Sequence, residues 1–148
     1  MTVGARKDLY RTLFKNSVAI APVKDILEGD DINGSPLDAL EAIRKLNVAL
    51  SDAYQVSITV ITVWVRDYSY VPETGEIYLT EPEVENFLHQ FRHHLQNIER
   101  KYERRGLTAE EYKGRPEEKL IYTETVHRLY GEDDARAWSK AIIELATE

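Results

Sequence analysis

Residues 80–105 read TEPEVENFLHQFRHHLQNIERKYERR, and this stretch decides how the chain folds. Thr80 and Glu83 make a capping-box pattern, in which two side chains bind the free backbone N–H groups at the start of a helix. Gly106 is a typical stop signal. Between them, apolar residues recur at helical spacing: Val84, Phe87, Leu88, Phe91, Leu95, Ile98 and Tyr102. The sequence therefore predicts a long helix with one face in the core.

Two histidines in the middle of this helix could bind a metal ion. His89 and His93 are four residues apart and lie roughly opposite the apolar stripe, facing solvent or a cleft. Such a pair can reach one tetrahedral ion, but two ligands alone hold zinc poorly. A third must come from elsewhere, and water would complete an open site. The candidates for the third ligand are Glu124, His127, Glu132, Asp133 and Asp134.

The run His89-Gln90-Phe91-Arg92-His93 matches the HExxH zinc motif except that glutamine replaces glutamate. A β-rich segment precedes it. Later, residues 132–139 read EDDARAWS, similar to an E-x-x-A-x-x-F-A pattern. Together these features, over residues 56–146, resemble compact zincin metallopeptidases of the gluzincin type, closest to the small ImmA/IrrE-like peptidases.

The resemblance implies a zinc ion held by His89, His93 and Glu132, with Gln90 in the position of the general base. It further implies a side chain near the metal that stabilises the oxyanion, for which Tyr130, His127 and His94 are candidates. An edge strand at 77–79 would pair with an extended peptide or protein substrate.

Gln90 changes the expected activity without changing the expected fold. A neutral amide can hydrogen-bond a water molecule but cannot take its proton, so hydrolysis should be severely impaired. One alternative is a pseudo-peptidase that acts as a peptide- or protein-binding regulatory module. Another is a metal-free structural protein whose helix displays histidines on a solvated face. A single E-x-x-H pair, Glu124 and His127, also occurs in di-iron proteins, but those require it twice.

The remaining segments complete an α+β prediction. Residues 1–34 are expected to form an irregular arm and loop, because turn residues such as Gly29 and Gly34 dominate there. Residues 35–148 are expected to form a compact zincin-like domain. Its first helix begins at Ser35-Pro36, a cap followed by proline at the first helical position.

After this helix, the sequence predicts a small, mostly antiparallel sheet: a long strand over 56–70, a turn, and an edge strand over 76–79. Two C-terminal helices should follow the central metal-binding helix, over 116–130 and 132–146, separated at Gly131.

Two charged features have ordinary structural interpretations. Arg92 could clamp a substrate carboxylate, although a surface arginine paired with a glutamate is commoner. The acidic cluster Glu132 to Asp134 could simply mark a helix N-terminus. His94 is more typical of a packed, hydrogen-bonded histidine than of a ligand.

Composition limits the remaining classes. The chain has 148 residues, of which 43% are hydrophobic and 30% charged, as expected for one soluble globular domain. Its net charge of −7 argues against nucleic-acid binding, since such proteins usually carry a basic field. No segment reaches membrane-spanning length. Without cysteine, the chain cannot depend on disulfides, and a cytoplasmic location is expected.

Overall fold

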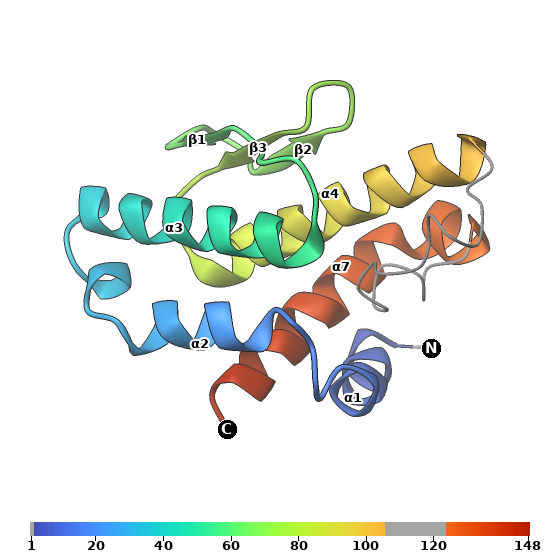
Figure 1. Cartoon of the computed structure of the whole chain (residues 1–148), viewed down its shortest axis with the longest axis horizontal. Helices are drawn as coiled ribbons and strands as arrows, with labels where there is room; N and C mark the ends of the chain where they lie inside the picture. Colours follow the sequence, from blue (N-terminus) through green and yellow to red (C-terminus); the bar gives the residue numbers. More distant parts are fainter. Residues whose placement is uncertain (1, 106–123) are drawn as a thin grey trace.

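The computed structural model describes the backbone of residues 2–105 and 124–148 and the side chains of residues 2–99 and 131–148. This part of the chain has an α+β fold with a small sheet (Figure 1). In chain order the elements are α1 (Val3–Leu13), α2 (Ile20–Glu28), η1 (Asp31–Asn33), α3 (Pro36–Tyr54), β1 (Ile61–Val63), β2 (Ser69–Val71), β3 (Glu76–Leu79), α4 (Val84–Arg105) and α7 (Glu124–Ala146).

The helices α3 and α4 form largely where the sequence predicted them. The Ser35 hydroxyl accepts the backbone N–H of Asp38 at 3.2 Å and caps α3. α4 begins at Val84 and not directly after Thr80, where the capping box predicted its start, because the carbonyl of Glu83 accepts the first helical bond from Phe87. The predicted stop at Gly106 lies outside the described residues.

The N-terminal segment is helical, so the prediction of an irregular arm and loop is wrong. The Thr2 hydroxyl caps α1 by accepting the N–H of Ala5 at 3.0 Å. α1 and α2 then bury a small set of side chains in the core. The apolar pattern of α1 is hard to recognise because Leu9 and Leu13 are 43% and 49% exposed, and its buried contact is an aromatic pair. That pair is Tyr10 and Phe14.

The sheet is mixed, which corrects the prediction of a mostly antiparallel one. Its strand order is β1-β3-β2, with β1 parallel and β2 antiparallel to β3. The predicted long strand over 56–70 is broken, because Trp64 adopts a left-handed φ of 60° directly after β1. The turn at Gly75 forms as predicted, with φ 76°. β3 is therefore the central strand and not an edge, and β1 and β2 are the two edge strands.

α4 lies between the sheet and α7, and α7 in turn packs against α1 and α2 (Figure 1). α7 runs without interruption through Gly131, so the predicted break there is wrong. Glu132 to Asp134 consequently lie inside the helix and do not form an acidic N-terminus. The part of the predicted 116–130 helix before Glu124 lies outside the described residues.

The core joins all of these layers. Trp138 and Ile142 of α7 are fully buried, together with Tyr54 of α3 and Phe91 of α4. Among the helices that the structure describes, none is long and apolar enough to cross a membrane.

The buried position of Phe14 gives a test of the N-terminal packing. Its ring is 3% exposed and contacts Tyr10 edge-on. Phe14→Ala should lower the free energy of unfolding by about 3–5 kcal/mol, as for other buried phenylalanines. The neighbouring Leu13→Ala, at an exposed position, should change it by no more than about 0.5 kcal/mol. Urea unfolding of both variants measures the difference, and equal effects would show that α1 does not pack as described.

Candidate metal centre

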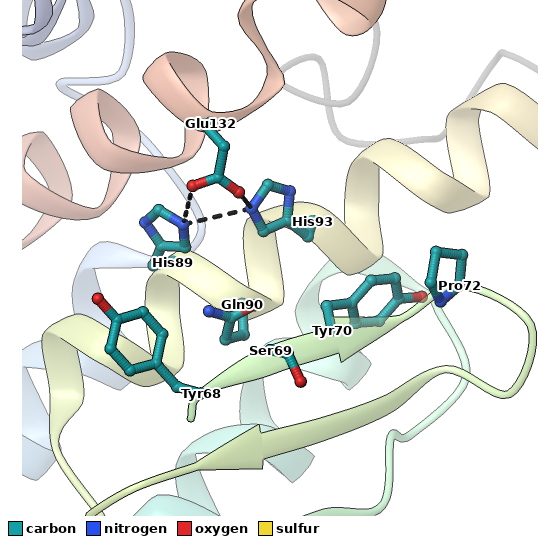
Figure 2. A pocket seen from close by; sticks show the side chains of 8 residues that line it. All are labelled: Tyr68, Ser69, Tyr70, Pro72, His89, Gln90, His93 and Glu132. Atoms are coloured by element: carbon teal, nitrogen blue, oxygen red, sulfur yellow. Dashed lines mark hydrogen bonds and ion pairs between the residues drawn. The ribbon is translucent and has the colours of Figure 1, made fainter. Parts of the chain in front are cut away.

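Three side chains from two helices converge on one point. His89 and His93 come from α4, one turn apart, and Glu132 comes from α7 (Figure 2). The Nε2 atoms of the two histidines are 3.2 Å apart. Glu132 places one carboxylate oxygen 3.1 Å from Nε2 of His89 and the other 2.6 Å from Nε2 of His93. The structure thus brings together the three residues that the sequence suggested as ligands.

The spacing of the two histidine nitrogens is close to that around a small tetrahedral cation. Ligand atoms about 2.0–2.2 Å from a tetrahedral zinc lie about 3.3–3.6 Å from one another, and these nitrogens are 3.2 Å apart. A divalent cation would satisfy all three atoms at once. Hydrogen bonds satisfy them less well, because two ring N–H groups donating to Glu132 would face each other across 3.2 Å. His and carboxylate donors also suit zinc.

The protonation equilibria of the cluster favour an anionic carboxylate beside an uncharged His89. Burial lowers the pKa of His89, and the neighbouring His93 lowers it further. Burial alone would raise the pKa of Glu132, but interaction with the imidazoles of His93 and His89, including hydrogen bonds from their rings, outweighs burial and lowers this pKa. A neutral imidazole and a carboxylate are the forms that bind a metal.

The cluster opens into a cleft of about 330 Å³ between α4 and the edge strand β2. Tyr68, Ser69, Tyr70 and Pro72 line it on the strand side. Gln90, only 3% exposed, lies between the histidine pair and β2 (Figure 2). The residue between the candidate ligands in the sequence thus places a neutral amide against the cleft.

Directly beside the cluster, a buried ion pair joins the two helices that carry it. Arg92 and Asp134 are 2% and 0% exposed. The guanidinium donates two hydrogen bonds to the carboxylate, from Nε at 2.8 Å and from the terminal nitrogen at 3.3 Å. It also lies over the rings of Trp138 and Phe14, 5.4 Å and 5.9 Å from their centroids. Arg92 is thus neither a surface residue nor a clamp facing the cleft.

Asp134 binds two further groups besides Arg92. The Tyr10 hydroxyl of α1 donates to one carboxylate oxygen, and the Gln96 amide donates to the other at 2.7 Å. Burial would raise the pKa of Asp134, but Arg92 and these hydrogen bonds lower it. Asp134 was one of the alternative metal ligands suggested by the sequence, but both of its carboxylate oxygens accept hydrogen bonds from other side chains.

His94 is a buried histidine that contacts Tyr70 of β2 and the segment before β1. Asn97 donates to the Tyr70 hydroxyl at 3.0 Å, and that hydroxyl contacts Nδ1 of His94 at 2.8 Å. Nε2 of His94 contacts the carbonyl of Ser57 at 3.0 Å. Both ring nitrogens are engaged, so His94 is poorly placed to stabilise an oxyanion. The other two candidates, Tyr130 and His127, and the alternative ligand Glu124 have side chains outside the described residues.

Sequence reasoning missed the buried pair, although its spacing carried a signal. Arg92 is four residues after Leu88 and three before Leu95, and both of these are buried. Asp134 is likewise one helical turn before the buried Trp138. An arginine and an aspartate on the apolar faces of two helices predict a paired interior charge.

Comparisons with known protein families, with characterised proteins and with solved structures found no significant match to this chain. The functional assignment therefore depends on the geometry of the site.

The buried pair can be tested by a double-mutant cycle. Asp134→Asn should cost about 3–5 kcal/mol of stability, because it leaves a buried guanidinium without its anion. Arg92→Met should also destabilise the protein. The double variant should be more stable than the sum of the single effects predicts, by about 0.5–3 kcal/mol. Urea unfolding measures all four proteins, and additive effects would show that the two charges are not coupled.

Proposed function

We propose that this chain is a zinc-binding domain of the zincin metallopeptidase type, with impaired hydrolysis because Gln90 replaces the catalytic glutamate. The observation that carries the proposal is the convergence of His89, His93 and Glu132, from two separate helices, within 4.8 Å of one another. The placement of this cluster next to a cleft and an edge strand supports the same function.

Each residue has a defined part in the proposal. His89, His93 and Glu132 would hold the zinc, leaving a fourth position toward the cleft. Zinc bound there would supply Lewis acidity, which activates water and polarises a peptide carbonyl. Gln90 lines the same cleft and can hydrogen-bond a water molecule, but its amide cannot accept the proton that hydrolysis releases.

The peptide would bind along β2. β3 already pairs with strands on both sides, so β1 and β2 are the two edge strands. Of these, β2 is the one whose residues Ser69 and Tyr70 line the cleft. An extended peptide added to this edge would form backbone hydrogen bonds and pass beside the ligand cluster. This replaces residues 77–79, which the sequence suggested for that role.

Zinc titration tests the metal site. The purified chain should bind one Zn²⁺, and both His89→Ala and Glu132→Ala should weaken binding by more than the roughly 10- to 100-fold typical of an outer-shell change. Asp133→Ala is the matched control, since it removes a carboxylate adjacent to Glu132 that is not part of the cluster.

Elemental analysis and competition with a chromogenic chelator provide the measurements. A chain that purifies without metal and binds none, or zinc binding that survives His89→Ala, would favour the metal-free structural protein instead.

Restoring the carboxylate tests the peptidase assignment. Gln90→Glu should raise zinc-dependent hydrolysis of a fluorogenic peptide mixture by roughly 10²- to 10⁴-fold, the usual contribution of a general base. The double variant Gln90→Glu/His89→Ala should remain inactive, which excludes a contaminating protease. If Gln90→Glu binds zinc and peptide without cleaving, the chain is better described as a pseudo-peptidase that binds peptides.

A further inference from the structure

Gln96 links the ligand cluster to the buried ion pair. Its side chain is 4% exposed and lies between α4 and α7. The amide oxygen is 2.8 Å from Nδ1 of His93. The amide nitrogen donates to the carbonyl of Gly131 at 3.0 Å and to Asp134 at 2.7 Å.

These contacts fix which way the amide faces. Both partners of the Gln96 nitrogen are acceptors, so this end must be the NH₂ group. The oxygen must then face His93, and an amide oxygen only accepts hydrogen bonds. Nδ1 of His93 therefore carries the proton. With Nδ1 protonated, Nε2 can carry a second proton and donate to Glu132, 2.6 Å away. When the ring is neutral, as metal binding requires, the lone pair is on Nε2, the atom that points to Glu132 and His89.

We infer that Gln96 is a positioning residue that holds the His93 ring in its Nδ1–H form, with the Nε2 lone pair directed at the metal, and that Asp134 fixes Gln96 in turn. The inference rests on the proposed zinc site. Asp134 is itself held by Arg92 and by Tyr10, so a chain of hydrogen bonds runs from the first helix to a zinc ligand.

The Gln96→Leu variant tests this role. It keeps the approximate size of the side chain but removes the acceptor for His93, so zinc affinity should fall by roughly 10- to 100-fold. Thr59→Val is the matched control, because it removes a different buried hydrogen bond, to Asn47, away from the cluster. It should lower stability without changing zinc affinity.

Gln96→Glu separates positioning from general packing. A carboxylate can still accept the His93 N–H, but it cannot donate to Gly131 and it repels Asp134. Zinc affinity should therefore stay above that of Gln96→Leu, while stability against urea falls. Affinities that simply follow stability across the three variants would overturn the inference.

Nitrogen NMR of the His93 ring provides a second readout that does not depend on zinc. In the metal-free parent, Nδ1 should carry a proton that exchanges slowly with water, and Gln96→Leu should abolish this protection. An unprotonated Nδ1 in the parent would overturn the inference. A parent that binds no zinc but keeps the protected Nδ1–H would overturn the proposed function while supporting the hydrogen bond.

Discussion

The ion pair between Arg92 and Asp134 is the interaction on which the arrangement of the site depends. Two full charges are buried between α4 and α7, and such a pair is tolerated only when its geometry and additional hydrogen bonds offset the loss of hydration. Here the contact is bidentate, and Tyr10 and Gln96 bind the same carboxylate. Because Arg92 directly precedes His93 and Asp134 follows Glu132 by two residues, fixing this pair also fixes the helix register that brings the three candidate ligands together.

The mixed sheet determines what lies on the other side of α4. β1 and β2 flank β3 as the two edge strands, one parallel and one antiparallel to it, and β2 is the edge that lines the cleft. Its position is secured by side chains as well as by pairing, since the Tyr70 hydroxyl contacts both His94 and Asn97 of α4. The same helix therefore presents candidate ligands toward α7 and anchors the edge strand on its opposite flank. Because these side-chain contacts attach β2 to α4, a sheet of only three short strands can form one wall of the cleft.

The sequence predicted those parts of the structure that depend on local pattern. The i,i+4 spacing of His89 and His93 and the later glutamate indicated a cluster that the structure indeed assembles, and the Ser35 cap marked the start of α3. The strand order could not be predicted, because it depends on the left-handed turn at Trp64 and on pairing between distant segments. The continuity of α7 through Gly131 was equally hidden, since tertiary packing outweighs the weak helix propensity of glycine. α1 was missed because only its contact with the rest of the fold reveals which of its residues are buried.

The residues that would hold a metal and the residue at the position of a catalytic base lie on different sides of α4. Gln96, Asp134 and Arg92 lie on the α7 side of α4 beside the candidate ligands, whereas Gln90 faces the cleft beside β2. The described hydrogen bonds of Gln96 join it to His93, Gly131 and Asp134 and not to Gln90. An amide at position 90 has nearly the size of a carboxylate but lacks its basic oxygen. On the proposed function, binding of a metal and of an extended peptide would not need a base at position 90, whereas the proton transfer of hydrolysis would.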